Sequence, residues 1–293
     1  MRNRGVLVYL ALTFGLSWAA MVIVARGLGL SLADPLPQLS LAFTPALAAI
    51  VVRRWVTREG FRDAGLALRL RAAWRYYLIA WFGPLGLLAA GIAVAGALGR
   101  YSPDTAALRR FAPGLPPVAL IAVLLVVALV LTPVYWGEEF GWTSYLRLRI
   151  FTDRPLLATL ATGLIWAVWH FPLAFLGYVE YRNVLLGLLW WTAGFMCQEI
   201  MLTWLRLRSG TIWTTSLAHA GNNMVLSLLA SIVLTDGAGL DDLVIMPIML
   251  VPQLGVCAWI LLSGRYRAVD PVTPLGAASA AHDPTREDRY ASH

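Results

Sequence analysis

The chain of 293 residues contains no lysine, so all 23 of its basic residues are arginine, and its acidic residues number only 16. Charged residues make up 13% of the sequence, which is roughly half the share found in soluble domains. Hydrophobic residues make up 59%, and the mean hydropathy is +0.69. So few polar side chains cannot cover a water-soluble fold of this size, and a disordered chain would be poorer in apolar residues. The composition therefore predicts a polytopic membrane protein.

Cysteine is also scarce. Cys197 and Cys257 are the only two, and both lie within apolar runs. We interpret them as packing residues rather than as a disulfide or a metal pair. The net charge of +7 comes from arginines that lie between the apolar runs. This pattern favours contact with membrane lipid and argues against a nucleic-acid partner.

Eight runs are long enough to cross a bilayer, for which a helix needs about 20 apolar residues. We therefore predict an all-α transmembrane bundle over residues 1–267, followed by a disordered cytoplasmic tail over 268–293. More arginines flank one set of span ends, which predicts that both termini are cytoplasmic. We expect a multi-pass protein of the cell membrane, in a bacterium the inner membrane. The predicted spans are 5–25, 36–52, 76–98, 116–135, 156–176, 184–205, 211–234 and 243–262.

Ionisable side chains inside spans are costly, by about 2.5–3.5 kcal/mol at mid-membrane, and they mark functional sites. The acids in or beside the apolar runs are Glu138, Glu139 and Glu199. The histidines within spans are His170 and His219. Apart from Glu199, these residues fall in three short segments.

The first segment holds Glu138 and Glu139 between Gly137 and Gly141, at the predicted cytoplasmic end of the fourth span. Adjacent helical residues point about 100° apart, so the two carboxylates cannot share one role. One can face the interior of the bundle while the other orients it. The alternative is a water-facing pair that caps the end of the helix.

The second segment places Trp166 and His170 on one helical face, at a spacing of four. Pro172 follows, and it frees the carbonyl of Val168 from its helical hydrogen bond. A kink beside a histidine suits a ligand or a base in a polar cavity. The alternative is a histidine that only bonds a neighbouring helix.

The third segment places His219 and Asn223 on one face of the seventh span. An asparagine amide is a neutral donor that can stabilise a developing oxyanion. The alternative here is again a polar contact between helices.

A carboxylate and two histidines that converge can hydrolyse a bond in two ways. They can hold Zn²⁺ through Glu138, His170 and His219, with an open position for water. Alternatively, a glutamate and a histidine can activate water directly, while the other histidine and Asn223 bind the oxyanion. The HExxH spacing is absent, so no single helix forms a zincin site.

These motifs in this order resemble the CPBP family of CAAX proteases and bacteriocin-processing enzymes. Its members are also called Abi proteins and are relatives of the type II CAAX prenyl endopeptidase. The resemblance covers residues 116–234, which we expect to form the catalytic core. It implies an intramembrane endopeptidase, and a metalloprotease if a metal is bound, that cuts near the cytoplasmic face. It also implies membrane lipid and a peptide or protein substrate as partners.

The resemblance implies a role for each motif residue. Glu138 would activate water, Glu139 would support it, and His170 would act with Glu138. His219 and Asn223 would complete the site as the oxyanion hole. The family pattern has an aromatic residue, usually Phe, where this chain has Trp166.

Two further residues stand around this predicted site. The family commonly has Arg where this chain has Thr143, and Arg147 or Arg149 is a conjectural substitute. Glu199 does not belong to the motif set, and we interpret it as a supporting residue that pairs with a cavity histidine or lies protonated against a helix.

Two other classes of protein compete with the peptidase. A non-catalytic immunity or regulatory membrane protein would keep the Glu/His constellation for structure. A transporter would use Glu138, Glu139 and Glu199 to relay protons. Against the transporter, the sequence shows no inverted repeat and no paired broken helices.

Overall fold

The computed structural model describes residues 2–102, 104–264 and 266, and this part of the chain is helical with no strand. The all-α prediction is therefore confirmed. The predicted tail, 268–293, lies outside the described residues. The elements in chain order are α1 (Arg2–Val22), η1 (Ile23–Gly27), α2 (Pro35–Ala42), α3 (Thr44–Val51), η2 (Val52–Val56), η3 (Arg62–Ala64), α4 (Leu70–Ala97), α5 (Ala106–Phe111), α6 (Pro117–Gly141), η4 (Trp142–Leu146), α7 (Pro155–His170), η5 (Phe171–Ala174), α8 (Val184–Ser209), α9 (Ile212–Gly221), η6 (Asn222–Ser227), α10 (Leu228–Ala230), η7 (Ser231–Gly237) and α11 (Asp242–Leu262).

Eight helices in the described residues are long and apolar enough to cross a membrane, as the sequence predicted. Several of them join an α-helix to a π-helical segment, as α6 joins η4 and α9 joins η6. Single π-helical turns within longer helices frequently mark functional sites. The bounds of the eight membrane helices are Asn3–Gly27, Pro35–Val56, Leu70–Ala97, Pro117–Leu146, Pro155–Ala174, Val184–Ser209, Ile212–Gly237 and Asp242–Leu262.

The fourth membrane helix is longer than predicted. We expected it to end near Tyr135, but it continues through η4 to Leu146. The Glu138–Glu139 pair therefore lies inside the helix rather than at its end. Hydropathy placed the end too early because these polar residues are buried among neighbouring helices, where they do not mark a helix terminus.

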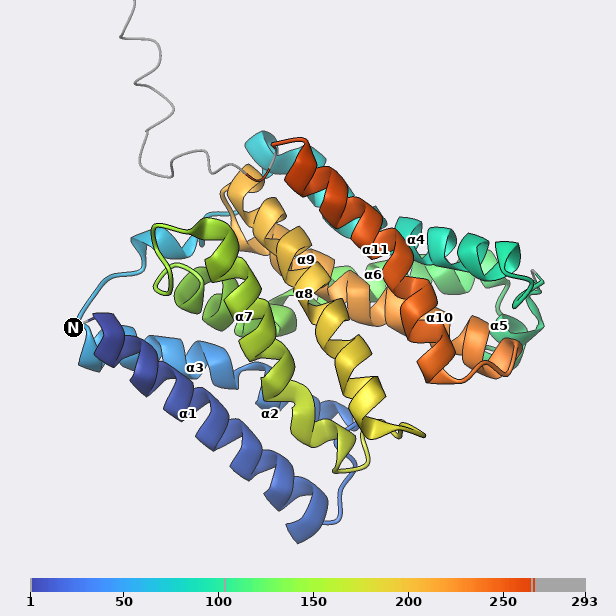
Figure 1. Cartoon of the computed structure of the whole chain (residues 1–293), viewed down its shortest axis with the longest axis horizontal. Coiled ribbons are helices and arrows are strands. Elements are labelled where there is room, and N and C mark those ends of the chain that lie inside the picture. The colour runs from blue at the N-terminus through green and yellow to red at the C-terminus, as the bar shows by residue number, and fades with distance from the viewer. Residues whose placement is uncertain (1, 103, 265, 267–293) are drawn as a thin grey trace, which may run out of the picture.

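Helix α6 is the element around which the site forms. It packs against α9 and α3, and it also contacts α2 and α4. Helix α7 packs against α8, which in turn packs against α9 and α11 (Figure 1). The two histidine-bearing helices, α7 and α9, are thus brought together with α6 by packing of the bundle.

The second membrane helix is broken at Phe43, between α2 and α3. Pro45 follows the break at the start of α3, where its missing N–H is tolerated. This break lies against Gly137 and Gly141 of α6. A Cβ at Gly137 would lie 2.5 Å from the carbonyl oxygen of Ala42. Only glycine lets the two backbones approach so closely.

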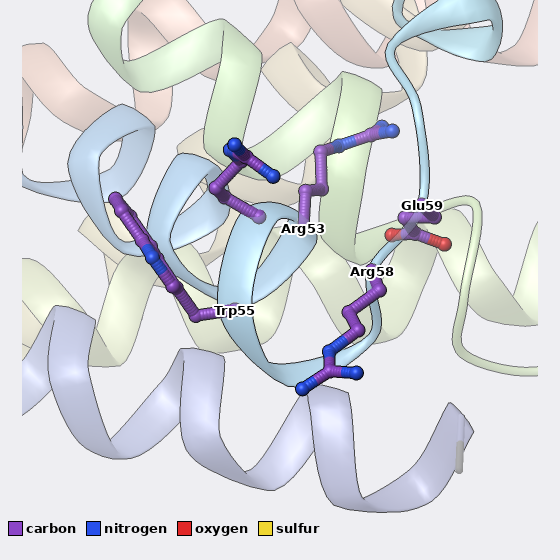
Figure 2. A pocket seen from close by; sticks show the side chains of 5 residues that line it. Arg53, Trp55, Arg58 and Glu59 are labelled. Atoms are coloured by element: carbon purple, nitrogen blue, oxygen red, sulfur yellow. The ribbon is translucent and has the colours of Figure 1, made fainter.

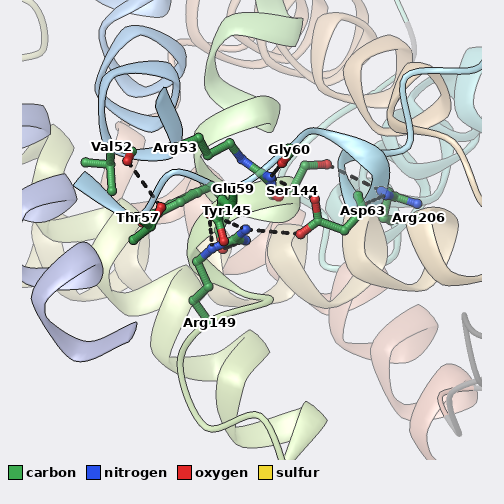
Figure 3. A network of polar contacts seen from close by, with 10 residues as sticks. All are labelled: Val52, Arg53, Thr57, Glu59, Gly60, Asp63, Ser144, Tyr145, Arg149 and Arg206. Carbon is green, nitrogen blue, oxygen red and sulfur yellow. Dashed lines mark hydrogen bonds and ion pairs between the residues drawn. The ribbon is translucent and has the colours of Figure 1, made fainter. Parts of the chain in front are cut away.

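A polar network joins η2, the following loop, η4 and α8, and we call it the arginine cluster: Arg53, Glu59, Asp63, Arg149 and Arg206 (Figure 3). Arg53 is fully buried, although the sequence placed it in a loop. It donates to the carbonyl oxygens of Gly60 and Ser144 at 2.6 and 2.9 Å. It also pairs with Asp63 at 2.8 Å. These contacts hold η4, the C-terminal end of the helix that carries Glu138 and Glu139, in place.

Candidate active site

The two glutamates of α6 are both buried. Glu138 is 7% exposed and Glu139 is 0% exposed. A water-facing end cap is therefore excluded as their role. A buried charge must find partners or it is strongly unfavourable, and the two side chains find different ones.

Glu138 turns toward α7. The indole Nε1–H of Trp166 donates a hydrogen bond of 2.8 Å to Oε2 of Glu138. Both side chains are buried. A hydrogen bond to a carboxylate is roughly twice as strong as one between neutral groups, so Trp166 fixes the orientation of this carboxylate.

Glu139 turns toward α9. Its Oε1 lies 2.9 Å from Nδ1 of His219, which places the imidazole N–H as donor to the carboxylate. Oε2 of Glu139 is buried and has no hydrogen-bond partner among the described residues. The two carboxylates therefore bond different helices, Glu138 to α7 and Glu139 to α9.

His170 ends α7. Its Nδ1 lies 3.0 Å from the carbonyl oxygen of Trp166, which can only accept, so the proton is on Nδ1. In the neutral ring the unshared electron pair then lies at Nε2. The ring stacks on Phe195 at 4.5 Å and lies edge-on to Trp169 at 4.6 Å.

The predicted kink at Pro172 is absent, and α7 simply ends there. The chain tightens into the short turn η5, and the N–H of Phe171 donates to the carbonyl oxygen of Val168. The carbonyl that Pro172 was expected to leave free is therefore satisfied. Proline here terminates the helix directly after His170.

Asn223 stands where α9 passes into the π-helical η6. Its side-chain amide donates to the backbone carbonyl of His219 at 3.2 Å. An asparagine amide has two N–H donors, so one remains for another acceptor. The shared face of His219 and Asn223 is preserved across the change of helix type.

Trp166 is the centre around which the two histidines are arranged. Its ring lies edge-on to His219, with a centroid distance of 5.0 Å, and edge-on to His170 at 5.9 Å. The sequence indicated only a supporting aromatic residue. The hydrogen bond to Glu138 could not be foreseen, because it depends on the rotation of α7 relative to α6.

Tyr135 is a neighbour that the sequence analysis did not single out. Its ring lies 4.6 Å from the ring of His219. The available signal was its spacing, since residues three apart share a helical face and Tyr135 precedes Glu138 by three.

Thr143 does not take the place of an arginine. Its hydroxyl donates to the backbone carbonyl of Glu139 at 2.8 Å. Arg149, one conjectural substitute, is held by Glu59 at 2.6 Å in the arginine cluster. Arg147, the other, is 6% exposed and interacts electrostatically with Glu199.

The predicted zinc ligands are Glu138, His170 and His219. In residues 2–102, 104–264 and 266, no three His, Cys, Asp or Glu side chains are placed to hold a metal ion. Nδ1 of His219 lies at Glu139 and Nδ1 of His170 at a carbonyl, which leaves Nε2 of each ring as the nitrogen that could bind a metal. The zinc expectation stays a prediction, and the chemistry below uses only protein groups.

Two cavities lie outside this centre. One, of about 520 Å³, is mostly apolar and opens among α4, α8, α9 and α11, where Ala218 and Asn222 are part of its wall. The other, of about 370 Å³, lies at the arginine cluster and is lined by Arg53, Arg54, Trp55, Arg58 and Glu59 (Figure 2). Neither is lined by the two glutamates or the two histidines.

Fold and site together define a polytopic membrane protein with carboxylates, imidazoles and an amide in its interior. Residues 117–225 match the family model described as type II CAAX prenyl endopeptidase Rce1-like. The match confirms the family resemblance and supports assigning the chain to the CAAX proteases. The matched segment contains Glu138, Glu139, His170, His219 and Asn223. No curated protein matches the chain.

Proposed function

We propose that this protein is an intramembrane endopeptidase that hydrolyses a peptide bond with water activated by Glu138. The family match supports CAAX protease activity at the coarser level. The observation that carries the finer proposal is the buried Glu138 carboxylate, which accepts a hydrogen bond from Trp166, whose ring contacts both histidines.

In this mechanism Glu138 removes a proton from water, and the resulting hydroxide attacks the scissile carbonyl carbon. Nε2 of His170 accepts a hydrogen bond from the remaining O–H of that water, because its electron pair is unshared, and this hydrogen stays with the new carboxyl group. Glu138 then passes its proton to the nitrogen of the leaving amine. A positioned general base of this kind contributes about 10²–10⁴-fold to a rate.

His219 and Asn223 stabilise the oxyanion. For His219 to donate from Nε2, the Glu139–His219 pair must hold two protons, because Nδ1–H is already given to Glu139. The second N–H of the Asn223 amide supplies the other donor. Such preorganised donors act strongly in a site that excludes water.

The proposed cut lies near the cytoplasmic face of the cell membrane. The support is the arginine-rich end of the bundle, since arginines are enriched on the cytoplasmic side. Glu138 lies only eight residues before the end of its helix at Leu146.

The test is cleavage of a farnesylated peptide with a C-terminal CAAX sequence by the purified protein in proteoliposomes. The product is the released tripeptide, measured by mass spectrometry. Glu138→Gln should lower the rate about 1,000-fold, because an amide cannot accept the proton from water. Thermal unfolding should remain as in the wild type.

Glu59→Gln is the matched control, since it changes a carboxylate of the arginine cluster instead. It should cleave at the wild-type rate. Retained cleavage by Glu138→Gln would refute the assignment of the base. Absence of cleavage by the wild type would favour a non-catalytic membrane protein for this substrate. Chelation followed by zinc addition tests metal dependence separately.

A further inference from the structure

One buried acid lies outside this mechanism. Glu199 of α8 is 0% exposed. Its Oε1 accepts a hydrogen bond of 3.0 Å from the hydroxyl of Thr203. Its Oε2 is buried without a hydrogen-bond partner among the described residues.

A series of hydroxyl groups leads from Glu199 to Tyr266, the last of the described residues. Thr203 lies 3.4 Å from the hydroxyl of Thr159 on α7. Thr159 in turn contacts the hydroxyl of Tyr266, which also bonds the carbonyl oxygen of Pro155. Pro155 begins α7, so this series of hydroxyl groups reaches the side of the bundle where the arginine cluster lies.

Arg147 lies at the same end and interacts electrostatically with both Glu199 and Tyr266. Its side chain is 6% exposed, and its Nε is buried without a hydrogen-bond partner among the described residues. Among those residues, Arg147 and Glu199 form no ion pair within 4 Å. Polar groups that attract each other across a longer gap are commonly bridged by water.

Toward the centre of the bundle, the same face of α7 continues the polar stripe. Thr159, Thr162, Gly163 and Trp166 recur at spacings of three and four, which places them on one face. The hydroxyl oxygen of Thr162 is buried and unpartnered among the described residues. Gly163 makes room for Glu199, because a Cβ there would lie 3.1 Å from the Cβ of Glu199.

This stripe reaches the proposed catalytic centre. From Thr159 to Trp166 the helix rises about 10 Å, and Trp166 bonds Glu138. Glu199 also interacts electrostatically with Glu139. Oε2 of Glu139 is one more buried oxygen with no described partner.

Four buried polar atoms on neighbouring elements therefore lack a partner among the described residues: Oε2 of Glu139, Oε2 of Glu199, Oγ1 of Thr162 and Nε of Arg147. Buried polar groups are nearly always hydrogen-bonded, and water fills polar interior space where protein groups do not reach. We propose that Glu199 is the midpoint of a hydrated path that connects the Arg147–Tyr266 end of the bundle with the Glu138–Glu139 pair.

The role of this path rests on the proposed function. Each peptide bond cleaved consumes one water, whose oxygen and one hydrogen go to the new carboxyl group and whose other hydrogen goes to the new amine. The path delivers that water from the aqueous face to the buried Glu138–Glu139 pair. Glu199 is therefore a positioning residue that holds water and does not touch the reacting atoms.

Radiolytic hydroxyl labelling of the full chain in nanodiscs tests for the path directly. Thr162→Cys introduces a thiol as the reporter, since thiols oxidise readily where water is adjacent. The native Cys197 and Cys257 are the internal controls, because they are buried at 5% and 4% exposure and contact each other.

We expect the introduced thiol to be oxidised and the two native cysteines to be protected. Adding Glu199→Leu should reduce oxidation of the introduced thiol to the level of the native cysteines. Gln198→Leu is the matched control, because the neighbouring side chain points to the apolar cavity and bonds Asn222. It should leave the labelling unchanged. Protection of the introduced thiol in the otherwise unchanged protein overturns the proposal, whether or not Glu199→Leu folds.

Cleavage of the farnesylated CAAX peptide gives the second readout. Glu199→Leu should lower kcat about 10-fold with KM unchanged, the effect of one lost hydrogen bond to a water of the path. Glu199→Gln retains polar atoms and should stay near the wild-type rate. Wild-type kcat in Glu199→Leu overturns the delivery role. If the wild type cleaves nothing, the proposed function fails while the labelling still decides whether the path exists.

Discussion

The helix that runs from Pro117 to Leu146 joins two polar regions of opposite character. In the arginine cluster, Arg53 makes three hydrogen bonds and Arg149 pairs with both Glu59 and Asp63. In the Glu/His centre, Oε2 of Glu139 stays unpartnered among the described residues. In the arginine cluster opposite charges are paired, and only Nε of Arg53 is buried without a partner among the described residues. Paired charges stabilise a fold, whereas a buried carboxylate oxygen without a partner can bind and react. The difference indicates that the arginine cluster stabilises the fold and that the Glu/His centre is the reactive region.

Removing Arg53 should produce the largest loss of stability. Arg53→Met leaves the carbonyls of Gly60 and Ser144 without this donor, and we expect a loss of roughly 3 kcal/mol. Thermal unfolding in one detergent measures it. Arg54→Met is the control, because the neighbouring side chain is exposed and should change little. Unchanged stability in Arg53→Met would contradict a structural role for the cluster.

Glu139→Gln changes the Glu/His centre, and it should lower the cleavage rate rather than the stability of the fold. The amide removes the charge that holds the His219 imidazole, and we expect the cleavage rate to fall roughly 100-fold. Single-turnover kinetics on the farnesylated peptide measures the change. A loss of stability with a normal rate per folded molecule would place Glu139 with the structural residues instead.

Trp166→Phe tests the hydrogen bond within the Glu/His centre, since it removes the N–H donor to Glu138. We expect kcat to fall roughly 10- to 100-fold with a smaller effect on KM. Trp169→Phe is a matched control on the same helix. It also loses ring volume from a buried position, but its indole N–H has no described hydrogen-bond partner. Equal effects in both variants would mean that packing, not the hydrogen bond, matters at Trp166.

The smallest expected effect is the pH response of Asp63. Burial acts to raise its pKa, but the hydrogen bonds and charges of Arg53 and Arg149 outweigh it and lower the pKa below the ordinary 3.8. Its stabilising contribution is therefore present above that value and is lost as the pH falls through the lowered pKa. Wild type should lose thermal stability on acidification in this window, and Asp63→Asn should lose less. Parallel curves would contradict the pairing.

The bundle was predictable because each span is recognisable from its local sequence, as a run of about 20 apolar residues. The catalytic motifs were visible for a similar reason, since ionisable residues in such runs are rare. The partners were not visible. Which glutamate meets Trp166 and which meets His219 depends on how α6, α7 and α9 rotate against one another, and no local pattern encodes that rotation.

Burial of Arg53 escaped the sequence analysis for a related reason. An arginine after an apolar run indicates a membrane surface, and Arg54 conforms to that pattern. Arg53 differs only because the loop over Glu59 and Asp63 folds back to cover it, and aromatic rings of Phe61, Phe140 and Tyr145 lie 5.4–5.8 Å from its guanidinium. Long-range packing, not sequence context, decides between the two neighbours.

The central claim is that Glu138 activates water and does not itself attack the substrate. A single turnover of the farnesylated CAAX peptide in water enriched with ¹⁸O tests this most directly, with enzyme in excess. Attack by activated water places one heavy oxygen in the new carboxyl group of the product and none in the enzyme peptide that carries Glu138. Heavy oxygen in the Glu138 side chain, with an unlabelled product, would show a covalent acyl intermediate and contradict the account.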